Sequence, residues 1–92
     1  MDIFAQIADR IINEQETIIG PVAIEQAQKV QGILIDSKKH EVRLEGDKKT
    51  ILEKLVKQYE ALFGLTSVEV CKGAVKGLIA QAPKDQLPQV LL

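Results

Sequence analysis

Residues that could bind a phosphate gather in one predicted turn, Gly46-Asp47-Lys48-Lys49-Thr50, between a predicted strand and a predicted helix. Phosphate-binding loops occupy the same setting, because backbone N–H groups at the start of a helix attract anions. A P-loop also needs a second glycine directly before its lysine, and here Asp47 and Lys48 intervene. The turn therefore favours Asp47 as a helix N-cap followed by solvated lysines.

The only histidine and the only cysteine do not form a typical metal or nucleophile site. His40 has acidic neighbours, but a zinc site takes three or four ligands that are rich in Cys and His. Cys71 lies on the apolar side of a predicted helix, which favours a buried core thiol over a reactive one. We therefore predict no catalytic residue, no metal ligand and no cofactor, and the pattern favours a non-enzymatic role.

Basic residues gather at a predicted hairpin and form the candidate nucleic-acid surface: Lys38, Lys39, His40 and Arg43. A β-ribbon of this kind can enter a DNA groove. However, Glu41 and Glu45 share the exposed strand face with Arg43. The net charge of −1, from 12 basic and 13 acidic residues, also lacks the basic excess of most nucleic-acid modules, so nucleic-acid binding is disfavoured.

Length and composition indicate one small globular domain that spans residues 1–92. The chain is 46% hydrophobic and 27% charged, which is enough apolar content to build a core. The N-terminus lacks the basic region and continuous apolar run of a signal peptide, and no stretch is long enough to span a bilayer. A lone cysteine fits a reducing compartment. We predict a cytoplasmic protein without membrane association.

The N-terminal part, residues 1–31, has the three- and four-residue apolar spacing of amphipathic helices. Gly20-Pro21 interrupts it, because the residue before a proline is disfavoured in a helix and proline suits a first turn. We predict helices over residues 2–19 and 21–30; one kinked helix of about 28 residues is the alternative.

A β-hairpin is predicted over residues 32–45. The apolar run at 33–35 and the alternating run at 41–45 are typical of strands, with a polar loop at 36–40 between them. An isolated two-stranded hairpin is marginal in water. It needs helices that cover it, or a second copy whose strands extend it into a four-stranded sheet.

Two further helices are predicted within residues 47–82. The first covers 48–63 and ends at Gly64, and the second covers 67–80, with Thr66 and Glu69 as a capping box. Residues 83–92 form an apolar tail, which would fold back on the core or lie in a partner's groove. The predicted fold is therefore α+β, in the order α-α-β-β-α-α.

The function that this pattern favours is a protein-interaction or regulatory module, as a homodimer. A chain of 92 residues has difficulty covering the hairpin edge, the apolar stripe of the first helix and the apolar tail at once. The predicted partner-binding residues are Ile33, Ile35, Leu87, Val90, Leu91 and Leu92. The alternatives are a small-molecule-binding or sensor domain with an aliphatic pocket between helix and hairpin, and a nucleic-acid-binding regulator.

Overall fold

Two aspartates begin the two longest helices of the computed structural model, which describes residues 1–36, 38, 39 and 41–92. The Asp2 carboxylate accepts a hydrogen bond from the Ala5 N–H at 2.8 Å, and Asp47 accepts one from the Thr50 N–H at 3.0 Å. Both caps satisfy N–H groups that the first helical turn leaves unpaired. The elements are α1 (Ile3–Ile19), α2 (Val22–Gln28), β1 (Ile33–Asp36), β2 (Glu41–Leu44), α3 (Lys48–Phe63), α4 (Leu65–Val75) and the 3₁₀ turns η1 (Ile79–Gln81), η2 (Lys84–Gln86) and η3 (Gln89–Leu91).

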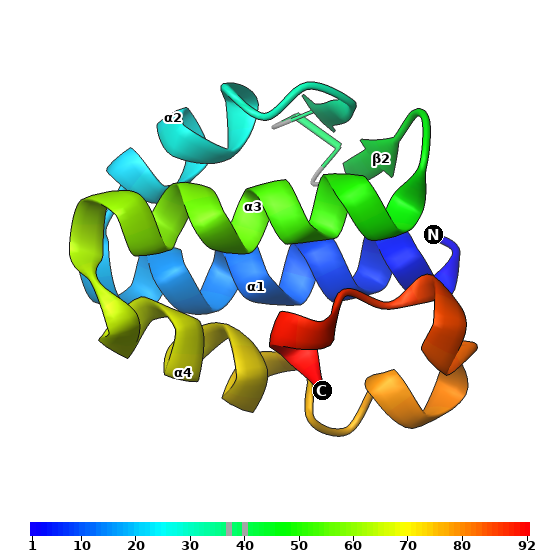
Figure 1. Ribbon diagram of the computed structural model, residues 1–92. Coiled ribbons are helices and arrows are strands. Elements are labelled where there is room, and N and C mark those ends of the chain that lie inside the picture. The colour runs from blue at the N-terminus through cyan, green and yellow to red at the C-terminus, as the bar shows by residue number, and fades with distance from the viewer. Residues whose placement is uncertain (37, 40) are drawn as a thin grey trace.

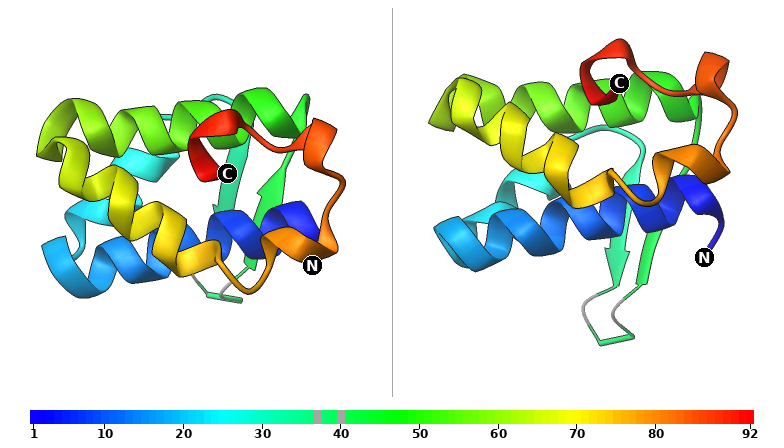
Figure 2. Two further views of the ribbon diagram at one scale, coloured as in Figure 1. Left: turned by 60° about the horizontal axis from the view of Figure 1, so that its bottom comes forward. Right: turned by 90° about the horizontal axis from the view of Figure 1, so that it is seen from below.

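This order confirms the predicted α+β fold, with two N-terminal helices in place of a single kinked helix. The α1 and α3 helices run side by side in the same direction, with α2 and α4 on opposite sides of the pair (Figure 1). The hairpin and the C-terminal tail also lie on opposite sides (Figure 2). The core lies between these elements and is built mainly from aliphatic side chains and Tyr59.

Two glycines make the corners between successive helices. Gly20 has φ 75° and Gly64 has φ 81°, a conformation that strains any residue with a Cβ. The Gly20 N–H donates to the Glu16 carbonyl at 2.9 Å, and the Gly64 N–H donates to the Glu60 carbonyl at 2.8 Å. Each glycine therefore ends one helix and turns the chain into the next.

The predicted start and end of the last helix were wrong. Its N-cap is Gly64, which leaves Thr66 inside the helix and the predicted capping box unused. The Gly64 corner opens α4 directly, because the Gly64 carbonyl accepts from the Ser67 N–H at 3.0 Å. The helix also ends at Val75 and not near residue 80, and residues 76–82 form a turn and η1. Helix-disfavouring Gly73 and Gly77 flank this end.

The hairpin strands pair antiparallel, with Ile33 opposite Leu44 and Ile35 opposite Val42. Ile33, Val42 and Leu44 are buried beneath the hairpin, while Leu34 faces outward. Helices cover the inner face, since β2 packs on α1 and β1 packs on α2. Whether a second copy extends this sheet stays a prediction.

The C-terminal tail folds back onto the core, which was one of the two predicted outcomes. It forms η2 and η3, and η3 packs against α3 and α4. Leu87 and Leu91 are 1% and 2% exposed, so the tail supplies two large side chains to the core.

The two helical halves repeat one another at an offset of 44 residues. Buried positions of α1 correspond to buried positions of α3: Ile7 to Ile51, Ala8 to Leu52, Ile11 to Leu55, Ile12 to Val56, and Gln15 to Tyr59. Two hydrogen bonds obey the same relation. Gln15 Nε2 donates to the Ser67 carbonyl at 3.1 Å, and the Tyr59 hydroxyl donates to the Ala23 carbonyl at 2.7 Å. Each half therefore inserts a polar side chain beneath the other half's corner.

Candidate interaction surfaces

The turn at Asp47 works as a helix cap. The Asp47 carboxylate accepts hydrogen bonds from both the hydroxyl and the N–H of Thr50. These bonds, with the charge of Lys49, lower the pKa of Asp47, because they favour its ionised form. The hydrogen bonds of Asp47 are therefore those of a helix N-cap, and the turn has no feature that requires a phosphate ligand.

Cys71 is fully buried, as the sequence predicts. Gln15 Nε2 approaches its sulfur at 3.4 Å while also bonding the Ser67 carbonyl. Burial raises the pKa of the Cys71 thiol, which keeps it protonated and inaccessible to a substrate. Within the described residues, no group of three His, Cys, Asp or Glu side chains is placed to hold a metal ion.

The basic residues at the hairpin share their surface with carboxylates. Lys38, Lys39 and Arg43 are exposed, but Lys39 and Arg43 border a depression that Asp36 and Glu41 also line. The Asp36 side chain accepts from the backbone N–H groups of Lys38 and Lys39 at 3.0 and 3.2 Å. The surface is therefore mixed in charge and lacks the uniform positive potential that phosphate contacts need. His40 lies outside the described residues.

The predicted partner-binding residues are divided between the core and the surface. Ile33, Leu87 and Leu91 are buried, and their side chains already pack against other parts of this chain. Ile35 and Val90 are partly buried, and Leu92 is 46% exposed. The structure does not bring the six together as one accessible surface.

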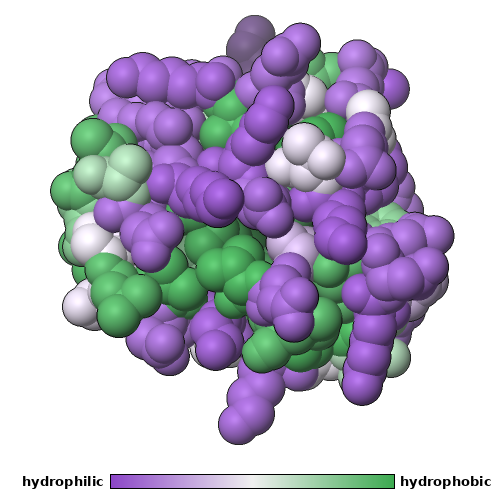
Figure 3. Space-filling view, viewed as in Figure 1, coloured by the Kyte–Doolittle hydropathy of each residue, from purple (hydrophilic) through white to green (hydrophobic). Residues whose placement is uncertain are grey.

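A different apolar surface, which we call the apolar end, lies where the corners meet solvent. It combines Ile18 at the end of α1, Leu62 and Phe63 at the end of α3, and Leu65 at the start of α4. Figures 1 and 2 place these helix ends at the same end of the molecule. Apolar side chains gather there at the left edge of the space-filling view (Figure 3).

The exposure of the apolar end is large for side chains of this kind. Ile18, Leu62, Phe63 and Leu65 are 60%, 52%, 38% and 69% exposed. With roughly 200 Å² for a fully exposed large side chain, they present about 400 Å² of mainly apolar surface. A standard interface takes about 800 Å² from each partner, of which about 57% is non-polar. The apolar end therefore supplies most of the non-polar part of one such face.

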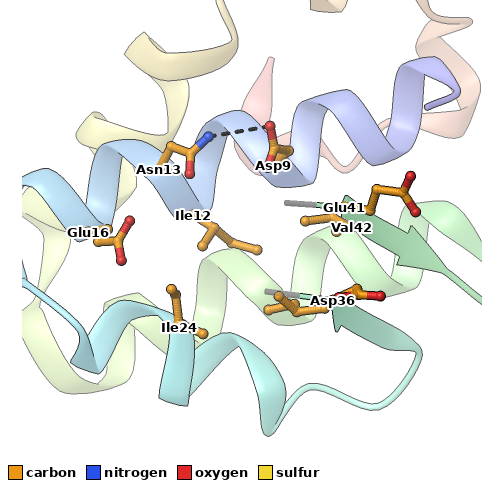
Figure 4. A pocket seen from close by; sticks show the side chains of 9 residues that line it. Asp9, Ile12, Asn13, Glu16, Ile24, Asp36, Glu41 and Val42 are labelled. Carbon is orange, nitrogen blue, oxygen red and sulfur yellow. Dashed lines mark hydrogen bonds between the residues drawn. The ribbon is translucent and has the colours of Figure 1, made fainter. Parts of the chain in front are cut away.

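A second feature is an acidic groove between α1, α2 and the hairpin. Its cavity volume is about 220 Å³, and its lining residues are Asp9, Ile12, Asn13, Glu16, Ile24, Ile35, Asp36, Glu41 and Val42. Ile12 and Ile24 lie between Glu16 on one side and Asp36 and Glu41 on the other (Figure 4). Asp9 accepts a hydrogen bond from Asn13 Nδ2 at 3.3 Å. The groove therefore offers an aliphatic floor with carboxylates at both ends.

Sequence reasoning missed the apolar end and the charge of the groove. The signal for the apolar end was present, because apolar residues directly precede both corner glycines, as Ile18-Ile19 and Leu62-Phe63. The same residues also continue the apolar stripes of their helices, which favours burial over exposure. The groove needed tertiary structure, since its residues come from three elements.

Comparisons of the chain with protein-family models, with curated proteins and with solved structures find no significant match. No helix in the described part of the chain combines the length and apolar character needed to cross a membrane. The apolar end and the acidic groove are therefore the features of this chain that bear on its function.

Proposed function

We propose that this protein is a non-enzymatic protein-interaction module that pairs with a second copy of itself through the apolar end. The observation that carries the proposal is the exposure of Ile18, Leu62, Phe63 and Leu65 at one end of the molecule. Exposed apolar patches of several hundred Å² frequently mark interaction sites, because covering them removes apolar surface from water.

A second copy is a suitable partner because the apolar end is built similarly by both halves. Ile18 corresponds to Leu62 and Ile19 to Phe63 at the 44-residue offset, so apolar groups surround both corners. A two-fold dimer requires a surface that is complementary to itself. An apolar surface meets this requirement without pairing like charges.

Solution mass tests this proposal. We expect light scattering over a range of concentrations to show a dimer for the native chain and a monomer for Leu65→Glu, since the variant buries a charge in the interface. Leu34→Glu is the matched control, because Leu34 is 44% exposed on the outer face of the hairpin.

Two results would contradict the proposal. A native chain that stays monomeric at all concentrations would exclude pairing. A dimer that Leu34→Glu disrupts and Leu65→Glu leaves intact would transfer the interface to the hairpin, in agreement with the four-stranded sheet expected from the sequence.

The alternative of a small-molecule-binding domain is favoured by the groove between helices and hairpin, which is where the sequence suggested an aliphatic pocket. Ile12, Ile24, Ile35 and Val42 provide its apolar lining. Its cavity of about 220 Å³, however, is smaller than the roughly 300–1,000 Å³ of typical ligand pockets. Its carboxylates also disfavour a neutral apolar ligand, so the interaction module remains the better proposal.

A further inference from the structure

The hairpin and the C-terminal tail cover corresponding helix pairs in the two halves. The hairpin packs on α1 and α2, whereas η3 of the tail packs on α3 and α4. In the second half, a short segment with Leu87, Pro88 and Leu91 inserts its apolar side chains into the core. The chain itself thus shows that a helix pair of this architecture accepts a short apolar segment folded into 3₁₀ turns.

The first half is covered less completely. Ile24 of α2 corresponds to Val68 of α4 at the 44-residue offset. Val68 is 5% exposed, but Ile24 is only partly buried and lines the acidic groove. The groove therefore leaves accessible an aliphatic surface whose counterpart in the second half is buried.

The charges around the groove indicate what its occupant must carry. Glu16, Asp36 and Glu41 line it together with Asp9, and none of its lining residues is basic within the described chain. Asp36 and Glu41 are also directly opposite each other across the two strands, a pairing of like charges that disfavours the hairpin unless cations are near. Asp36 and Glu41 also line the neighbouring depression with Lys39 and Arg43, whereas Glu16 lines only the groove, which has no basic residue among its described lining.

The separation of the carboxylates fits a short peptide. Glu16 lies on one side of Ile12 and Ile24, and Asp36 and Glu41 lie on the other (Figure 4). A segment with a basic residue on each side of a leucine or valine would place its aliphatic side chain over Ile12 and Ile24 and a cation toward each group of carboxylates.

We propose that the acidic groove binds a short segment of a partner protein in which aliphatic residues are flanked by lysine or arginine. The aliphatic side chains pack on Ile12, Ile24 and Ile35, and the basic groups pair with Glu16 at one end and with Asp36 and Glu41 at the other. The surface is separate from the apolar end, so this binding does not depend on dimerisation.

The test uses a fluorescently labelled peptide, Lys-Leu-Pro-Lys-Val-Leu-Leu, which is residues 86–92 with lysine in place of both glutamines. We expect fluorescence anisotropy with the full chain to show saturable binding that weakens as salt is added. The same peptide with glutamate at both positions should bind at least tenfold more weakly. Neutralising the groove with Glu16→Gln and Glu41→Gln together should weaken binding by about tenfold, since each exposed charge pair contributes up to about fivefold.

The matched control is the double variant Glu14→Gln and Glu25→Gln. Glu14 lies on α1 and Glu25 on α2; both are exposed and neither lines the groove, so the net charge changes by the same amount as in the groove variant. This control should retain affinity within about twofold. Equal weakening by both double variants would show attraction to overall charge and overturn the proposal.

Amide chemical shifts locate the peptide. The proposal predicts that the largest changes fall at Ile12, Ile24 and Ile35. Changes confined to residues 87–91 and the surfaces of α3 and α4 would mean that the peptide displaces the tail and does not enter the groove. Leu65→Glu should lose dimerisation and keep its affinity for the peptide. Loss of peptide binding together with dimerisation would overturn the independence of the groove from the apolar end.

Discussion

The two helical halves have the same interior and different coverings. In both, a glycine with positive φ ends the first helix, and its carbonyl accepts from the N–H three residues later at 3.0 Å. In both, the first helix donates a side-chain hydrogen bond beneath the corner of the other half. The chain after the second helix differs, as it forms a hairpin in one half and 3₁₀ turns in the other.

The difference shows that similar sequences form a strand where a second strand follows to pair with them and form 3₁₀ turns where none does. Gln31-Gly32-Ile33-Leu34-Ile35 and Lys76-Gly77-Leu78-Ile79-Ala80 share a glycine followed by apolar residues. The first is followed by an alternating segment that pairs with it as β2. The second is followed by Pro83, which has no N–H to donate to a sheet. It satisfies its backbone locally in η1 instead.

Truncating Gln15 and Tyr59, the two side chains that each half inserts beneath the other, should lower the free energy of unfolding the most. We expect Tyr59→Ala to lower the free energy of unfolding by about 4 kcal/mol, because it removes a fully buried ring. The corresponding variant Gln15→Ala should cost about 2 kcal/mol, since a smaller side chain and its hydrogen bonds are lost. Urea denaturation followed by circular dichroism measures both.

Tyr59→Phe serves as the control for the hydrogen bond to Ala23. It keeps the ring and should cost about 1 kcal/mol. If Gln15→Ala had no measurable cost, the two halves would not depend on each other's buried side chains in the way that the structure indicates.

The next largest change in stability is expected at Gly32, which follows α2, and not at Gly77, which follows α4. Gly32 has φ 98°, and a Cβ there would lie 2.7 Å from Ile51 Cδ1 and 2.8 Å from the Glu45 carbonyl oxygen. Gly32→Ala should therefore destabilise the fold by about 2–4 kcal/mol. Gly77 has open space around its Cα, so Gly77→Ala should be neutral or stabilise by about 0.5 kcal/mol. Thermal unfolding measures both variants, and equal decreases in stability would contradict the different surroundings of the two glycines.

The smallest expected effect is a pH dependence that only the second half has. Cys71 occupies the position that Ala27 occupies in the first half. Burial raises the pKa of its thiol in the folded state, so the unfolded chain loses this proton first as the pH rises. The contribution of the protonated Cys71 thiol to the free energy of unfolding is therefore complete below about pH 8, and the free energy of unfolding falls by about 1 kcal/mol by pH 9.5.

Cys71→Ala makes the two halves match at this position and tests the assignment. Urea denaturation at pH 7.5 and 9.5 should give nearly equal unfolding free energies for the variant, whatever its cost at neutral pH. A native-like decline in Cys71→Ala would assign the pH dependence to another group.

The sequence predicted the elements that depend on local signals. The α3 helix matches its predicted range of 48–63, because Asp47, an uninterrupted apolar stripe and Gly64 all act within a few residues. The start of α4 was missed because Gly64 also serves as its N-cap, a role that depends on the backbone path and not on a capping side chain. Its end was missed because two glycines weaken a helix without fixing where it stops.

The internal repeat was not predicted either. In α1 and α3 the corresponding residues share burial more than identity, as Gln15 and Tyr59 illustrate. Their similarity lies in the carbonyls that they reach across the molecule, which only the tertiary structure shows. The same holds for the acidic groove, whereas both the apolar end and the corner glycines can be found along the sequence.

The exchange of Gln15 and Tyr59 between the halves has a consequence for how the chain folds. The two hydrogen bonds connect residues 52 and 36 positions apart, so closing either one requires a long loop to be ordered first. Neither half has a complete core until the other docks onto it. We therefore expect the helices to gain stability together in one cooperative step, with docking as the slow event and no half that persists as an independently folded unit.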